Sequence, residues 1–113
     1  MKCEEIKCIV SNMMHNVKEA RDKIEKAYAW REKHKGIADW FKVMAAGHLE
    51  YNNNAHQMVR NGLQEMRSEA HHDDVAKHHH AMGKCEAYEE WLEQIVTETA
   101  EVKAMIDGYG RNA

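Results

Sequence analysis

The sequence predicts an all-α protein: an elongated, antiparallel three-helix bundle in up-down-up order. Three long stretches repeat apolar residues at alternating steps of three and four, which places them on one face of a helix. The 113 residues include no proline to interrupt these stretches. We expect helices over about residues 4–34, 37–67 and 74–107, and their short connections favour antiparallel neighbours. Residues 1–113 are expected to form a single domain.

The first predicted helix has a regular apolar stripe. Its members are Ile6, Val10, Met13, Val17, Ala20, Ile24 and Ala27. The stripe predicts a start near residue 4, although the Ser11-Asn12 pair is a competing start that would leave residues 2–10 outside the helix. Gly36 follows three cationic residues, a pattern typical of a helix end near residue 34.

The second predicted helix carries a stripe that turns polar at its centre. Its members are Ile37, Phe41, Met44, His48, Tyr51, Ala55, Met58, Gly62 and Met66. Asp39 lies near its start, where an anion favours the helix dipole. Gly47 is unfavourable in a helix interior by roughly 1 kcal/mol. No glycine or proline marks the break after this helix, which we place near residues 68–73.

The polar centre of this helix is a candidate binding site. His48, Tyr51, Asn52 and His56 are the residues that we assign to it, and positions four apart share one helical face. One interpretation is a pocket for a small ligand. The other is a buried polar layer, in which His48 and one asparagine satisfy each other or fix the register of the helices.

The third predicted helix has the longest stripe. Its members are Val75, His79, Met82, Cys85, Tyr88, Leu92, Ile95, Thr99, Val102 and Ile106. Asp73 and Asp74 can cap its start. Gly108 and Gly110 can end it.

A histidine-rich segment over residues 71–80 is a candidate metal site. Imidazole and carboxylate groups bind zinc, nickel or copper, so Zn or Ni is the possible cofactor. Asp74 and His78 are four residues apart, on one helical face, and His71 or His72 can approach from the preceding turn. The alternative is a solvated helix start without a metal.

Composition and charge exclude several classes of protein. A net charge of −3 and the absence of a basic, aromatic surface argue against nucleic acid. No apolar run approaches the roughly 20 residues of a membrane span. Three cysteines and the lack of a signal-peptide pattern favour a cytoplasmic location. The third helix is acidic and the first is basic, which predicts ion pairs across their flanks or an acidic docking face.

No catalytic motif stands out, so we expect a non-enzymatic protein. There is no glycine-rich phosphate loop and no G-x-S-x-G elbow. A single Glu-x-x-His motif, at Glu69, is too little for a di-iron bundle. Trp40 and Trp91 widen two stripes, and they either close the core of the monomer or mark a second apolar face. We expect a homodimer that buries the remainder of these stripes. The expected function is protein–protein association, and the alternatives are metal binding at 71–80 and a small-ligand pocket.

Overall fold

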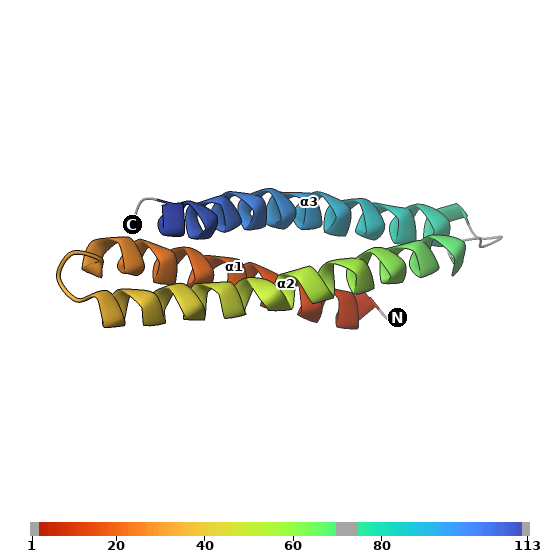
Figure 1. The fold of residues 1–113 in the computed structure, drawn as a ribbon. Coiled ribbons are helices and arrows are strands. Elements are labelled where there is room, and N and C mark those ends of the chain that lie inside the picture. Colours follow the sequence, from red (N-terminus) through yellow and green to blue (C-terminus); the bar gives the residue numbers. More distant parts are fainter. Residues whose placement is uncertain (1–2, 70–74, 112–113) are drawn as a thin grey trace.

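The computed structural model describes residues 3–69 and 75–111. These residues form three α-helices and no strand: α1 (Cys3–Trp30), α2 (Lys35–Glu69) and α3 (Val75–Arg111). In Figure 1, α2 runs back along α1, and α3 returns in the direction of α1. The molecule measures 64 × 17 × 16 Å. The predicted all-α fold, an elongated up-down-up bundle of three long helices, is confirmed.

α1 buries one continuous face. All seven residues of its predicted stripe are buried, from Ile6 at its start to Ala27 near its end. The helix begins at Cys3, so the Ser11-Asn12 pair does not start it. α1 and α2 share the most extensive helix–helix contact in the bundle. Alanines seven residues apart, at Ala20 and Ala27 in α1, leave room for this close packing because their side chains are small.

The α1–α2 turn differs from the prediction. α1 ends at Trp30, whose carbonyl accepts the backbone N–H groups of Lys33 at 3.0 Å and of His34 at 2.8 Å. His34 Nδ1 then accepts the N–H of Ile37 at 3.1 Å, which caps the start of α2. Gly36 therefore lies in the first turn of α2 and does not end α1. No glycine in the described residues has a positive φ, so the proposed glycine end of α1 is wrong.

α2 is rotated relative to its predicted stripe. Its buried residues are Ala38, Ala45, Leu49, Asn52, Ala55, Val59, Gly62 and Leu63. Two of the predicted positions, Ala55 and Gly62, are buried, whereas Tyr51 is 37% exposed and Met58 is 50% exposed. The predicted stripe followed the largest apolar side chains. The real core face follows smaller ones, because α2 carries apolar residues on two sides.

α3 extends beyond its predicted end. It continues to Arg111, so Gly108 and Gly110 do not end it. At this end Tyr109 is buried beside α1 and α2, and the hydroxyl of Tyr28 donates to the Met105 carbonyl at 2.8 Å. The proposed caps Asp73 and Asp74 lie outside the described residues. Five of the predicted stripe positions are buried: Cys85, Leu92, Ile95, Val102 and Ile106.

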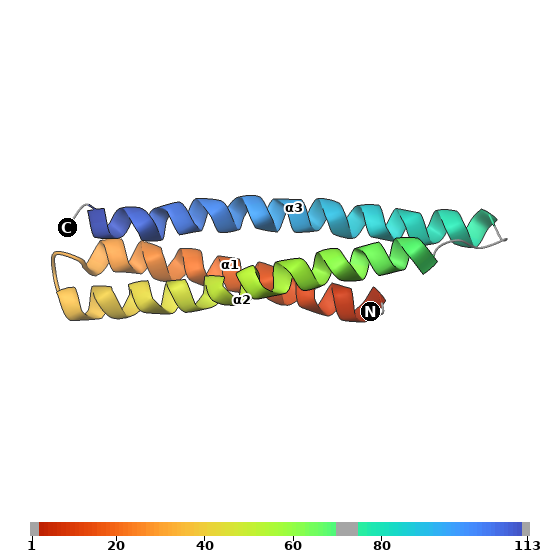
Figure 2. The same ribbon diagram turned by 45° about the vertical axis from the view of Figure 1, so that its right-hand side comes forward.

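The helices are of unequal length. α1 has 28 residues, α2 has 35 and α3 has 37. The first described residue, Cys3, lies against Tyr88 of α3, with 3.3 Å between Sγ and the hydroxyl oxygen. α2 and α3 therefore continue past the described start of α1 as a two-helix section (Figure 2). None of the described helices combines the length and apolar character that would let it cross a membrane.

Ion pairs join the flanks of the helices. Arg21 of α1 lies 3.1 Å from Glu101 of α3, an ion pair of the kind that one interpretation of the charge pattern predicted. α2 adds two contacts to the acidic α3, from Arg60 to Glu93 at 2.8 Å and from Arg67 to Glu89. These pairs are exposed, so each stabilises the fold by about 0–1 kcal/mol.

Candidate functional site

Asn52 of α2 forms a polar layer that joins all three helices. Its side chain is 2% exposed. Its Nδ2 donates to the Met13 carbonyl of α1 at 3.0 Å and to the Thr99 hydroxyl oxygen of α3 at 3.2 Å. Because a carbonyl only accepts, the Met13 contact fixes which end of the amide faces α1. Oδ1 is buried and has no hydrogen-bond partner among the described residues, which costs about 1–3 kcal/mol.

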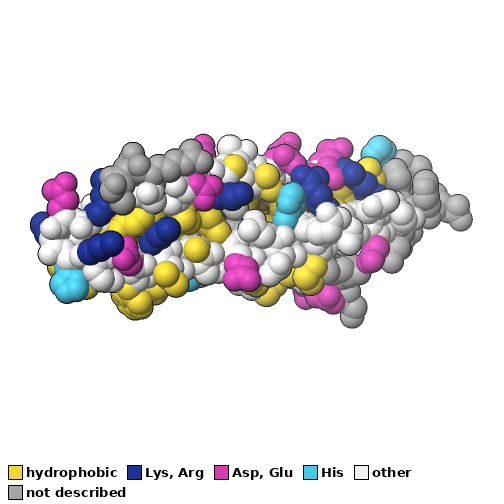
Figure 3. Space-filling model, viewed as in Figure 1, with side chains coloured by type: hydrophobic (Ala, Val, Ile, Leu, Met, Phe, Trp, Pro, Cys, Tyr) yellow, Lys and Arg dark blue, Asp and Glu magenta, His cyan; other side chains and the backbone are white. Residues whose placement is uncertain are grey.

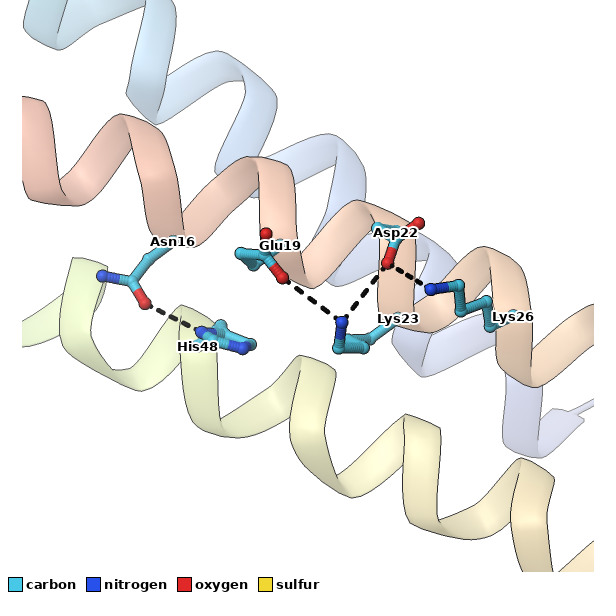
Figure 4. Close-up of polar contacts among 6 residues, drawn as sticks. All are labelled: Asn16, Glu19, Asp22, Lys23, Lys26 and His48. Atoms are coloured by element: carbon cyan, nitrogen blue, oxygen red, sulfur yellow. Dashed lines mark hydrogen bonds and ion pairs between the residues drawn. The ribbon is translucent and has the colours of Figure 1, made fainter.

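His48 lies one turn before Asn52 and faces α1. Its Nδ1 is 2.8 Å from Asn16 Oδ1, so the ring N–H donates to the amide oxygen. Figure 4 shows this contact bridging α1 and α2. An asparagine therefore satisfies His48, as the polar-layer interpretation expects. The asparagine comes from α1 and not from the run of asparagines in α2.

α1 also carries a separate chain of ion pairs near this contact (Figure 4). Lys23 Nζ lies 3.2 Å from Glu19 and 3.3 Å from Asp22, and Lys26 lies 3.0 Å from Asp22. The hydrogen bond from Lys26 lowers the pKa of Asp22, and the hydrogen bond to Glu19 raises the pKa of Lys23. These groups border α2 and pair with one another, two acids with two bases.

His56 lies one turn after Asn52 and faces α3. Its Nε2 accepts the Nε–H of Arg60 at 2.6 Å, and Arg60 also donates to Glu93 of α3 at 2.8 Å. Burial lowers the pKa of His56, and the positive charge of Arg60 lowers it further. A neutral imidazole is the form that can accept from Arg60. His56 is thus held as a neutral acceptor between α2 and α3.

A cavity of about 200 Å³ opens beside the polar layer. It is lined by Met13, Asn52, Asn53, His56, Val96, Thr99, Ala100 and Lys103. Two of the four residues predicted for a ligand pocket, Asn52 and His56, come together here. His48 faces α1, and Tyr51 is on the outer side of α2. The structure therefore distributes the four residues around α2 and brings only two of them to one cavity.

The outer side of α2 carries a second set of residues, most of them apolar, which we call the outer stripe. Its members are Trp40, Val43, Gly47, Tyr51, Asn54 and Met58, and all six are exposed. At 3.6 residues per turn, positions 40, 47, 51 and 58 fall within about 40° of one another. Figure 3 shows hydrophobic side chains along the lower left edge of the molecule, over the first half of α2.

Sequence reasoning mixed the outer stripe with the core. Val43 and Gly47 were not assigned to any face, and Tyr51 and Met58 were assigned to the core. The available signal was the seven-residue spacing of Trp40, Gly47 and Asn54, which runs alongside the buried core positions of the same helix. Two interleaved seven-residue patterns in one helix indicate two apolar faces.

The three cysteines differ in their exposure to solvent. Cys85 is buried, and burial raises the pKa of its thiol. The hydrogen bond with Cys3 raises the pKa of the Tyr88 hydroxyl to about 12, with burial as the second cause. Cys8 is exposed and bonded weakly to Asn12 at 4.0 Å. Since the thiolate is the nucleophile, a raised pKa makes Cys85 unreactive.

The predicted metal site lies mostly outside the described residues. His71, His72 and Asp74 are not described, and His78 lies in the first turn of α3. Within residues 3–69 and 75–111, no group of three or more His, Cys, Asp or Glu side chains could hold a metal ion. A zinc or nickel site over residues 71–80 stays a prediction.

No family model, curated protein or solved structure matches this chain. Its function must therefore be argued from its own residues.

Proposed function

We propose that this protein acts through protein–protein association, that it associates with itself as a dimer, and that it does not catalyse a reaction. The outer stripe of α2 is the observation that carries this proposal. Three free thiols, at Cys3, Cys8 and Cys85, suit a reducing cytoplasm as the place where it acts.

The outer stripe leaves large apolar side chains in water. In the part of the chain that the structure describes, five large hydrophobic residues are exposed. Trp30 ends α1, and the other four lie on α2: Trp40, Val43, Tyr51 and Met58. Trp40 is 58% exposed and Val43 is 68% exposed. Scattered apolar residues are normal on a protein surface, but a contiguous apolar face marks an interaction site. Burying such side chains gains about 25 cal/mol per Å².

Aromatic residues and methionine are also the types enriched at the centres of protein interfaces. Trp40, Tyr51 and Met58 recur along one line of α2. Between Trp40 and Met58 the sequence has two ionised residues, Lys42 and Glu50. Lys42 is placed over the Tyr109 ring of α3, 5.8 Å from its centroid. The outer stripe is therefore poor in charge, as the core of an interface is.

Light scattering coupled to size exclusion tests the association. The protein should elute with twice the chain's mass of 13.2 kDa at high concentration. A variant with Trp40→Ser and Met58→Ser should elute as a monomer with its helical content unchanged. Trp30→Ser is the matched control, because Trp30 is 40% exposed but belongs to α1. A wild-type monomer at every concentration would contradict the proposal.

A second candidate function is the binding of a small apolar molecule that carries a hydrogen-bond donor. The observation that favours it is the cavity beside Asn52, whose Oδ1 lacks a partner. Met13, Val96 and Ala100 supply an apolar wall, and Thr99 and His56 add polar atoms. A donor reaching Oδ1 would remove the cost of that buried, unpaired acceptor.

Phenol and anisole are suitable probes for this cavity, because both are small and apolar but only phenol donates a hydrogen bond. We expect phenol to shift the side-chain amide resonances of Asn52 in a nuclear magnetic resonance titration and to bind more tightly than anisole. Asn52→Leu should abolish the difference between the two. Equal binding of both probes, or no shift at Asn52, would exclude this function.

A further inference from the structure

We propose that the outer stripe pairs antiparallel with the outer stripe of a second copy, about a two-fold axis at the height of Leu49. This inference rests on the proposed self-association and adds its geometry. It follows from the positions of the exposed residues along α2, the openness of one glycine and the sparse charge around them.

The spacing of the outer stripe is that of a helix–helix seam. Trp40, Gly47 and Asn54 are seven residues apart, and Tyr51 and Met58 are also seven apart, which is the repeat of paired helices. Trp40 to Met58 spans about 27 Å of helix at 1.5 Å per residue. These positions lie away from Leu49 and Asn52, which face the core. The outer stripe is thus long and narrow enough for one further helix.

Four of the six members of the outer stripe are placed symmetrically about Leu49. Trp40 and Met58 are each nine residues from it, and Gly47 and Tyr51 are each two residues from it. In an antiparallel pair, Trp40 therefore lies opposite Met58 of the partner subunit, and Tyr51 lies opposite Gly47 of the partner subunit. A two-fold axis repeats each contact. Such self-complementarity is what an interface between identical copies needs and what a different partner would not require.

Side-chain size matches across these contacts. A Cβ on Gly47 would meet no atom within 4 Å, so the monomer gives no steric reason for a glycine there. Glycine in a helix interior costs about 1 kcal/mol relative to alanine. In the proposed pair, the bare backbone at Gly47 gives room for the tyrosine ring of the second copy. The other contact sets a methionine against a tryptophan, a favourable sulfur–aromatic arrangement.

The charge around the outer stripe provides a test of the antiparallel pairing. Glu50 is exposed and lies one residue from the axis. An antiparallel pair brings its carboxylate near Glu50 of the partner subunit, and like charges repel. Glu50→Gln should therefore tighten the dimer, most clearly at low salt. A partner of other sequence, or a parallel pair of different register, would not place these two carboxylates together.

Disulfide cross-linking tests the geometry in the full chain. The background carries Cys3→Ser, Cys8→Ser and Cys85→Ala. Met44→Cys and Asn54→Cys are then introduced on separate copies, since Met44 and Asn54 are each five residues from Leu49. One copy is labelled with ¹⁵N. After mixing and mild oxidation, mass spectrometry should find position 44 of one copy joined to position 54 of the other.

Gly47→Leu gives an independent test, because it fills the space that the tyrosine of the second copy would use. We expect it to weaken dimerisation by about tenfold or more without loss of thermal stability at low concentration. Gly83→Leu is the matched control, because Gly83 is also exposed in a helix and open around its Cβ position. It should leave dimerisation unchanged.

The outcomes separate this inference from the proposed function. A dimer that cross-links at 44–44 or 54–54, or that tolerates Gly47→Leu, overturns the antiparallel pairing and leaves self-association standing. A monomer at all concentrations overturns both. The 44–54 cross-link, together with the loss of dimer in Gly47→Leu and tighter dimer in Glu50→Gln, supports the pairing.

Discussion

α1 and α2 pack against each other along the bundle, but α1 has one apolar face and α2 has two. In α1, the seven apolar positions from Ile6 to Ala27 are all buried. In α2, the core face is built from smaller side chains and one asparagine, while Trp40 and Met58 remain exposed. An apolar residue in α1 therefore serves the fold, whereas an apolar residue in α2 serves either the fold or an interface. The two roles can be separated by mutation.

Removing core volume from α1 should have the largest effect on stability. Ile24 is fully buried, so Ile24→Ala should lower the free energy of unfolding by about 2–5 kcal/mol, because it loses burial and leaves a cavity. Val43→Ala on the outer stripe should change it by no more than about 0.5 kcal/mol. Urea unfolding at low protein concentration compares the two. Equal losses would show that the outer side of α2 is as buried as the face of α1.

The polar layer offers a way to make the core of α2 resemble that of α1. Asn52→Leu should raise the free energy of unfolding by about 1 kcal/mol, because it removes a buried, unpaired acceptor and adds apolar burial. Asn53→Leu, at an exposed neighbour, is the control and should change it by less than about 0.5 kcal/mol. Urea unfolding again provides the measurement. A clear loss of stability in Asn52→Leu would mean that its two hydrogen bonds outweigh the unpaired Oδ1.

Gly47→Ala should change the stability of the monomer and the affinity of the dimer in opposite directions. It should raise the stability of the monomer by about 1 kcal/mol, since alanine is the better helix former and its Cβ meets no neighbour. Gly83→Ala should do the same in α3. Thermal unfolding at low concentration measures this gain, and sedimentation equilibrium measures association. Only Gly47→Ala should weaken the dimer, and a similar effect from both glycines would remove the special role of Gly47.

His56 should give the smallest effect, a dependence of stability on pH. Burial holds its pKa below the usual value of 6.5 in the folded chain. As the pH falls below about 6.5, the unfolded chain takes up the proton first, so the free energy of unfolding decreases. His56→Gln should therefore lose less stability than the wild type between about pH 7 and pH 5. Above about pH 7.5, where imidazole is neutral in both states, the two curves should run parallel.

The accuracy of the sequence prediction varied with the number of apolar faces in a helix. For α1 the stripe from Ile6 to Ala27 was the sole regular pattern, and every position proved buried. For α2 the pattern contained two overlapping stripes, and the larger side chains drew the prediction towards the outer one. The end of α1 was placed four residues late, because the side chain of His34 caps α2 where a glycine end had been expected.

The candidate site was located by sequence but not assembled by it. The unusual run around Gly47 and Asn52 marked the centre of α2 as the place where the core pattern weakens. Its partners come from other helices: Met13 lies 39 residues from Asn52 in the sequence, and Thr99 lies 47 residues away. No local pattern connects residues at such separations. His48 faces α1 and His56 faces α3. No local pattern predicts this difference either, because it depends on where the other two helices lie.

The amino-acid sequence by itself determined that this chain forms three long helices in an elongated bundle, because a period of three and four is a property of each segment alone. It also determined that α2 is unusual at its centre. Only the tertiary structure decided which side of α2 is covered, because burial depends on where two other helices lie. Because α1 and α3 cover the opposite side of α2, Trp40, Tyr51 and Met58 face outward. They form the proposed surface for a second copy.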